Sequence, residues 1–145
     1  MEEMVKLAER AVEASRFWGR ELDYSAESLE WVDALAQKVF VSGRKQQLPD
    51  RFLAGIANLY GAYLGEVLLR SGLDTLDFAW RENEEGVIGI GREDMWADPA
   101  AKVYKRITQG PEHDLMSYFE IIFGMAIGAV DLNDPRVHVL SEEEV

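Results

Sequence analysis

The stretch GAYLGEVLL, residues 61–69, places two glycines and a glutamate inside an apolar run of helical length. Glycine weakens a helix by about 1 kcal/mol relative to alanine, and a carboxylate removed from water costs several kcal/mol unless a partner compensates it. On a helical wheel, one side of residues 50–71 is bulky, with Phe52, Ile56, Tyr60, Tyr63 and Val67. The other side is flat, with Ala54, Ala57, Gly61 and Gly65. The stretch therefore predicts a central helix whose flat face admits another backbone closely.

A second set of small residues indicates where that other backbone comes from. Gly124 and Gly128 in FGMAIGAV have a similar helical spacing, so we expect the helix over about residues 111–130 to cross the flat face. The alternative is a cleft bounded by glycine backbone, which is a feature of ligand sites.

Glu66 lies one turn before Arg70, in the order that favours an ion pair within a helix. The simplest interpretation is a surface or boundary pair of these two residues. Two alternatives stay open: a buried partner such as Lys105 or Arg106, or a functional carboxylate with a shifted pKa.

Composition limits the classes of function. The chain has 145 residues, with 48% hydrophobic and 29% charged residues, as expected for one folded domain. Its net charge of -12 repels nucleic acid and anionic membranes, so we expect neither as a partner. Cysteine is absent, which excludes disulfides and thiolate sites. These features and the acidic N-terminus, which lacks a secretory pattern, favour a cytoplasmic protein. The long apolar run 52–69 contains Asn58 and Glu66, which argues against a membrane span.

The periodicity predicts a single α+β domain over residues 1–145, with frayed ends near 1–3 and 141–145. Five helices are expected, over about 4–18, 25–43, 50–71, 99–108 and 111–130, the second capped by Asp23 or Ser25 and the fourth by Asp98. Between them, an antiparallel sheet of two or three strands is expected between about Thr75 and Trp96. The predicted core contains Leu35, Ile56, Tyr63, Val67, Ile107, Phe119 and Ile122.

The fourth expected helix carries the sharpest charge feature. Lys102, Lys105 and Arg106 can share one of its faces. Between Glu82 and Asp98 there are six acids and one base, so one interpretation is that the basic face pairs with this acidic hairpin. The other is a site for an anion such as a phosphate or a carboxylate.

Catalytic and metal-binding motifs are absent. The chain has no G-x-S-x-G, Walker, H-E-x-x-H or G-x-G-x-x-G pattern in the required context. His113 and His138 each lack a second histidine at ligand spacing, and residues 131–134 lack the pattern of an EF-hand loop. We therefore assign no catalytic residue, metal or cofactor; a protein that is not an enzyme is favoured, and an enzyme stays open as the alternative. Glu27, Glu30 and Asp33 are interpreted as a solvated stripe.

Three segments carry a resemblance: YSAESLEWVD (24–33), GAYLGEVLLR (61–70) and DPAAKVYKRITQGPEHDL (98–115). Together they resemble a family of small bacterial proteins that has no assigned activity. The resemblance implies a bacterial, cytoplasmic protein and transfers no catalytic role. It directs attention to Tyr24, Glu66, Lys102, Lys105, Arg106 and Glu112. The family pattern has a glycine pair before the first strand, and SGLDTLDFAW (71–80) departs from it, which leaves the start of the hairpin open.

The sequence is compatible with two functions that belong to different functional classes. The favoured one is a non-enzymatic interaction domain, similar to an inhibitor or an immunity protein, whose acidic surface binds a basic protein. The alternative is a binding protein or enzyme for a small anionic ligand, with a pocket between the hairpin and the third and fourth helices. Its candidate ligand-binding residues are Tyr24, Glu66, Trp80, Lys102, Lys105 and Arg106. Convergence of Glu66 and Arg106 in one concave pocket would favour the alternative.

Overall fold

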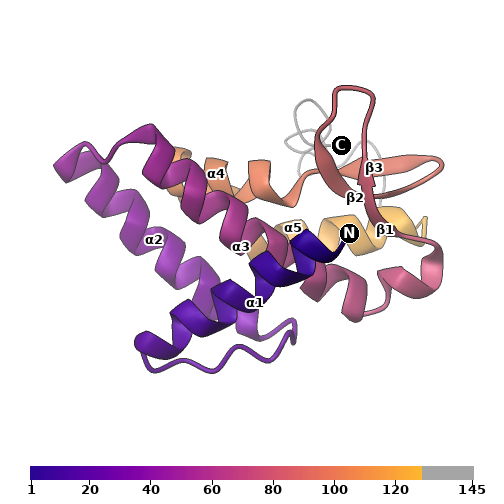
Figure 1. Cartoon of the computed structure of the whole chain (residues 1–145), viewed down its shortest axis with the longest axis horizontal. Helices are drawn as coiled ribbons and strands as arrows, with labels where there is room; N and C mark the ends of the chain where they lie inside the picture. Colours follow the sequence, from indigo (N-terminus) through magenta and orange to yellow (C-terminus); the bar gives the residue numbers. More distant parts are fainter. Residues whose placement is uncertain (129–145) are drawn as a thin grey trace.

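A computed structural model of the chain describes residues 1–128 (Figure 1). It contains helices α1 (Glu2–Phe17), α2 (Ser28–Gln46), α3 (Asp50–Arg70), α4 (Pro99–Gln109) and α5 (Leu115–Ala126). Strands β1 (Ala79–Glu82), β2 (Ile88–Arg92) and β3 (Met95–Ala97) form one antiparallel sheet in the order β1-β2-β3. Two short 3-10 turns, η1 (Leu73–Leu76) and η2 (Pro111–His113), complete the path. The predicted α+β class is confirmed.

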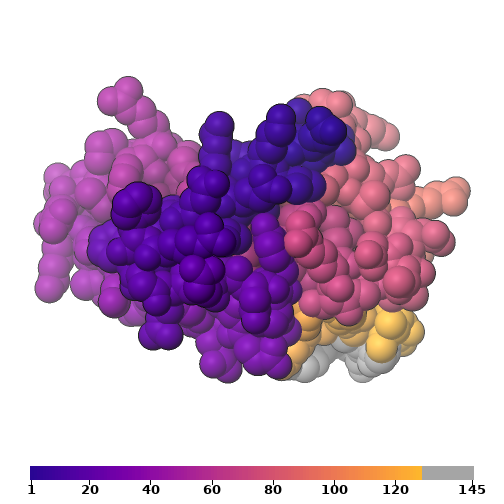
Figure 2. All heavy atoms as spheres, turned by 60° about the horizontal axis from the view of Figure 1, so that its bottom comes forward, coloured from indigo at the N-terminus to yellow at the C-terminus, as the bar shows by residue number. Residues whose placement is uncertain are grey.

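Helix α3 is the centre of the molecule, and every residue from Tyr60 to Leu69 is buried. Helices α1 and α4 both pack against it. Figure 2 shows α1, in indigo, lying across one face of the molecule. α3 is long and apolar enough to cross a membrane, and 61% of its most apolar window is buried inside the protein.

The flat face of α3 is a packing surface, but its neighbour is α4. A Cβ atom added to Gly61 would lie 2.4 Å from the Cα of Ala100. The expected crossing with the helix that contains Gly124 is therefore wrong at this position. The first turn of α4, Pro99-Ala100-Ala101, has side chains nearly as small as the glycines of FGMAIGAV. Both segments could therefore approach the flat face closely, and helix periodicity alone does not show which of them does.

The inner face of the sheet packs on the same helix. Trp80 on β1 pairs with Ile90 on β2, which in turn pairs with Ala97 on β3. The indole of Trp80 lies over Gly65, where an added Cβ would be 2.1 Å from its Cη2 atom. Gly65 is thus small because an aromatic ring occupies the place of its side chain.

The outer face of the sheet is covered by a second tryptophan. The ring of Trp96 lies 2.7 Å from the place of a Cβ on Gly89 and 3.1 Å from that on Gly91. Its Nε1 donates a hydrogen bond to the carbonyl oxygen of Arg81 at 3.3 Å. This ring ties all three strands together.

Several boundaries differ from expectation. The sequence predicts the sheet from about Thr75, but the first strand begins at Ala79, because residues 73–76 form η1 and Asp77 adopts a left-handed conformation with φ of 69°. α2 continues past the expected end at Gly43 to Gln46, where Gln47 has φ of 51°. The Asp98 cap is confirmed, since its side chain accepts from the amide of Ala101.

Of the predicted core residues, Tyr63, Val67, Ile107 and Ile122 are buried. Leu35, Ile56 and Phe119 are half-buried and pack against the core. The predictions that concern His138, residues 131–134 and the frayed segment 141–145 fall outside the described residues, as do the last two residues of the expected fifth helix.

Candidate functional site

Glu66 is a buried carboxylate, only 6% exposed, with both oxygens engaged. Oε1 accepts from Nε of Arg70 at 3.0 Å and lies 2.9 Å from Nη2 of the same residue. Oε2 accepts from Nε1 of Trp80 at 2.8 Å. The predicted partner Arg70 is therefore confirmed, and the buried position of the carboxylate requires both partners.

Arg70 continues this cluster toward the loop between α1 and α2. Its guanidinium carbon lies 3.7 Å from the centre of the Tyr24 ring, which stacks in turn on the ring of Tyr63 at 5.0 Å. The hydroxyl of Tyr63 accepts from the amide of Tyr24 at 2.9 Å and shares a 2.6 Å hydrogen bond with Ser28. Tyr24 has φ of 64°, which a residue with a large side chain rarely adopts. These contacts hold the loop against α3 in a strained conformation.

The phenols of this cluster are kept neutral. Burial raises the pKa of Tyr63 above the usual tyrosine value, and its hydrogen bond with Ser28 offsets part of that effect. Burial also raises the pKa of Tyr24, against the lowering effect of Arg70. Neither hydroxyl is activated as a base or nucleophile near neutral pH.

Arg106 belongs to a different cluster. Its Nε and Nη2 donate to the two carboxylate oxygens of Asp33 on α2, at 2.9 and 3.2 Å, and its side chain is 3% exposed. Asp33 Oδ1 also accepts from the amide of Leu115 at the start of α5, at 3.0 Å. The expectations that Arg106 faces the acidic hairpin or Glu66, and that Asp33 is part of a solvated stripe, are wrong. This ion pair joins α2, α4 and α5.

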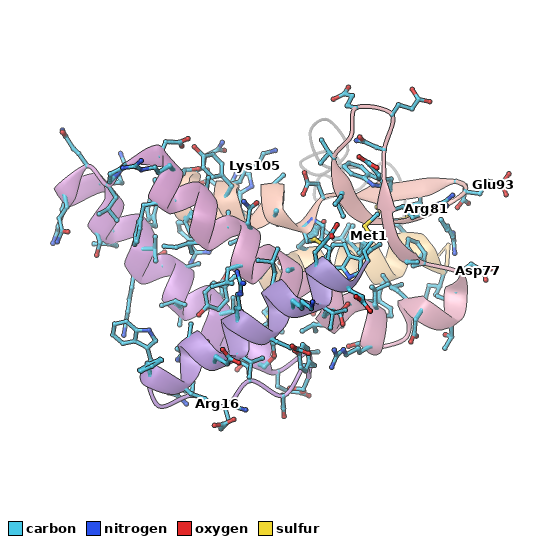
Figure 3. The ribbon with its side chains drawn as sticks, in the orientation of Figure 1. Met1, Arg16, Asp77, Arg81, Glu93 and Lys105 are labelled. Atoms are coloured by element: carbon cyan, nitrogen blue, oxygen red, sulfur yellow. The ribbon has the colours of Figure 1, made fainter. Side chains whose placement is uncertain are left out.

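Lys102 is buried on the same helix, with 3% exposure. Its Nζ lies 3.4 Å from Nδ1 of His113 in η2 and 5.6 Å from the centre of the Tyr118 ring. Burial, and after it the charge of Lys102, lowers the pKa of His113 below the usual histidine value. Lys105 is half-buried, and Figure 3 shows it on the part of the molecule away from Arg81 and Glu93.

Five of the six candidate residues therefore divide into two clusters, and the sixth, Lys105, is a half-buried residue of α4. Tyr24, Glu66 and Trp80 lie where the α1–α2 loop, α3 and β1 meet. On α4, Lys102 points toward η2 and Arg106 points toward α2. A small cavity of about 10 Å³ lies between α2, α3 and α4. It is lined by Val32, Leu35, Ala36, Val39, Ile56, Tyr60, Val103 and Ile107. None of the six candidates lines it.

The hairpin between β1 and β2 presents acidic side chains on a fixed loop. Glu82, Glu84 and Glu85 are exposed and form no ion pair with another residue in 1–128. The side-chain oxygen of Asn83 accepts from the amides of Glu85 and Val87, each at 2.9 Å. The amide of Asn83 closes the loop on the carbonyl oxygen of Val87 at 2.8 Å.

The second turn of the sheet adds Glu93 and Asp94, both exposed. Figure 3 shows Glu93 projecting from this end of the molecule. Arg92 donates to Asp94 at 2.7 Å, and this hydrogen bond lowers the pKa of Asp94. Asp98, counted with the hairpin acids in the sequence, is instead the half-buried cap of α4.

Sequence reasoning missed the ion pair of Asp33 with Arg106 and the stacking of Arg70 on Tyr24. Asp33 stands beside the buried Val32 and four residues after the buried Leu29. A carboxylate at the edge of an apolar stripe is a signal that could have identified it. The Arg70 contact had no such signal, because it depends on the strained backbone of Tyr24.

No family model, curated protein or solved structure matches this chain.

Proposed function

We propose that this protein is a non-enzymatic interaction domain that binds a basic protein partner through the acidic hairpin, defined as Glu82, Glu84, Glu85 and Val87. An inhibitor or an immunity-like protein would act in this way. The resemblance noted in the sequence supports the bacterial cytoplasm as its setting. The proposal contains no catalytic step, cofactor or metal.

The observation that carries the proposal is the exposure of these carboxylates on an ordered loop. Their charges are not neutralised by cations within residues 1–128, so they remain available to a partner. Asn83 fixes the loop through its two amide contacts, which reduces the conformational entropy lost on binding. The net charge of -12 also accelerates the approach of a cationic partner.

The alternative pocket for an anionic ligand has less support. Glu66 and Arg106 do not converge, since each is held by a different neighbour. The place between the hairpin and α3 is filled by the indole of Trp80 on Gly65. The small cavity has an apolar lining and is much smaller than ligand pockets of about 300–1,000 Å³.

The test is affinity capture from a cell extract with the full chain as bait, followed by mass spectrometry and titration of the captured protein in purified form. The test variant Glu84→Gln/Glu85→Gln removes two hairpin charges, and the control Glu9→Gln/Glu13→Gln removes two exposed charges from α1. We expect a basic protein whose affinity falls about tenfold for the hairpin variant and is nearly unchanged for the control.

Equal retention by the hairpin variant and the control would reject the hairpin as the binding surface. Capture of a small molecule, lost in Glu66→Gln with stability kept, would favour the pocket instead.

A further inference from the structure

The corner between α2 and α3 carries a positively charged surface, opposite in sign to the acidic hairpin. We define the basic tip as Val41, Arg44, Lys45, Arg51 and Phe52, at the end of α2 and the start of α3. Val41 is 40% and Phe52 51% exposed, and the three cations are exposed. None of these cations forms an ion pair with a residue in 1–128, although Arg44 lies over the ring of Phe40. In a chain with net charge -12, this end combines exposed apolar groups with unneutralised positive charge.

The basic tip lies at one end of the long axis, whereas the acidic hairpin projects from the upper side of the sheet in the other half of the molecule (Figure 1). α3 begins at the tip with Asp50, and its residue Gly65 holds Trp80 of the hairpin strand. Fifteen residues of helix separate these two points, or roughly 22 Å at the usual rise of about 1.5 Å per residue. Both surfaces combine charged side chains with exposed apolar ones, since Val87 of the acidic hairpin is 38% exposed.

We propose that a second copy of this chain occupies both surfaces, in an antiparallel dimer in which each basic tip contacts the acidic hairpin of the other copy. This inference rests on the proposed function, because it assigns to the same acidic hairpin one binding partner, the basic tip of a second copy. A two-fold axis forms both contacts at once, so the assembly is closed and does not grow into a filament.

The charges and the apolar groups of the two surfaces complement each other. In this dimer the exposed Val41 and Phe52 meet the exposed Val87, and the cations of the tip face the carboxylates of the hairpin. An apolar centre with a charged rim is the usual anatomy of a protein interface. The repulsion between two copies of net charge -12 acts over longer distances, and salt at about 0.15 M screens it beyond roughly 8 Å. Direct contacts across the dimer are screened less.

The test is sedimentation velocity of the full chain over a range of concentrations at about 0.15 M salt and at about 1 M salt. Three reversals are compared with the wild type: Lys45→Glu/Arg51→Glu at the tip, Glu84→Lys/Glu85→Lys at the hairpin, and the control Glu9→Lys/Glu13→Lys on α1. Circular dichroism and urea denaturation establish that each variant is folded.

We expect the wild type and the control to dimerise at the lower salt and to dissociate at the higher salt. Each of the two surface reversals alone weakens dimerisation by more than about tenfold. A mixture of the tip variant and the hairpin variant restores dimers, because each acidic end then faces a basic end. Restoration in the mixture separates charge complementarity from a simple loss of folding.

A wild type that stays monomeric at both salt concentrations would overturn the dimer. So would dimers that neither reversal weakens, or a mixture that stays monomeric. These outcomes leave the proposed function intact if the hairpin variant still loses the basic protein captured from extract. Dimers that behave as expected, together with no hairpin-dependent capture, would instead limit the hairpin to self-association.

Discussion

Gly61 and Gly65 occupy successive turns on one side of α3, and both are small because a neighbour occupies the place of the side chain. At Gly61 the neighbour is the backbone of Ala100, and at Gly65 it is the ring of Trp80. Backbone cannot move aside as readily as a side chain, so the contact at Gly61 tolerates the least change.

We therefore expect Gly61→Leu to destabilise the fold by about 1–3 kcal/mol or more, because it forces α4 away from α3. Gly55→Ala is the control on the same helix. Nothing lies within 4 Å of a Cβ at Gly55, so alanine there should stabilise the helix by roughly 0.5–1 kcal/mol. Urea denaturation measures both, and an unchanged free energy of unfolding for Gly61→Leu would contradict the close crossing.

The carboxylate of Glu66 and the indole of Trp80 should be coupled in energy. Glu66→Gln places an amide against two donors, and Trp80→Phe leaves Oε2 without its donor, so each change should cost about 1–3 kcal/mol. Because they disrupt the same hydrogen bond, the double variant should cost less than the sum, by roughly 0.5–3 kcal/mol.

Denaturation of the four proteins of this cycle gives the coupling. Glu120→Gln, an exposed residue of α5, is the matched control and should stay within about 0.5 kcal/mol of the wild type. Strictly additive losses would show that Glu66 and Trp80 do not act as a pair.

At the scale of elements, η2 places His113 against the buried side of α4. Burial lowers the pKa of His113, and Lys102 lowers it further, with smaller contributions from Lys105 and Arg106 against the opposite effect of Glu112. The unfolded chain, with the ordinary value of 6.5, then binds a proton at higher pH than the folded protein. The free energy of unfolding should therefore fall as pH drops through this value, and it should level off below the folded pKa.

Denaturation of the wild type and of His113→Gln at about pH 7.5 and about pH 5.5 isolates this effect, because all other groups, His138 included, are common to both proteins. The wild type should lose more stability than the variant over this range. The carboxylates Asp23 and Asp94 have lowered pKa values, so their contributions are lost only at more acidic pH. The same pH dependence in both proteins would contradict a buried, neutral His113.

The sequence was sufficient to predict which segments form helices and where the sheet lies, since those depend on local periodicity and caps such as Asp98. It was insufficient to predict which faces meet. Lys102 and Arg106 share a side of α4 by spacing, but they have different partners. Lys102 lies beside His113 of η2, and Arg106 pairs with Asp33 of α2. The alternation of Leu76, Phe78 and Trp80 predicted a longer strand than exists, because the left-handed Asp77 interrupts it.

At the scale of the whole molecule, α3 is as apolar as a membrane span, but its neighbours cover most of that surface. We expect the folded protein to remain separate from lipid vesicles in a flotation assay, with either neutral or anionic lipids, because insertion would require α1 and α4 to leave α3. The charge of -12 adds repulsion from the anionic vesicles. Flotation with neutral vesicles would contradict this expectation.

The packing of Trp80 on Gly65 also implies an order in which the elements fold. Trp80 on the inner face of the sheet packs on Gly65, and this flat surface exists only after α3 has formed. Helices close local contacts within microseconds, whereas pairing of distant segments waits for the chain to search. During folding, the three strands should therefore be assembled last, on a helical scaffold that is already complete. The acidic hairpin is then displayed only by molecules that have finished folding.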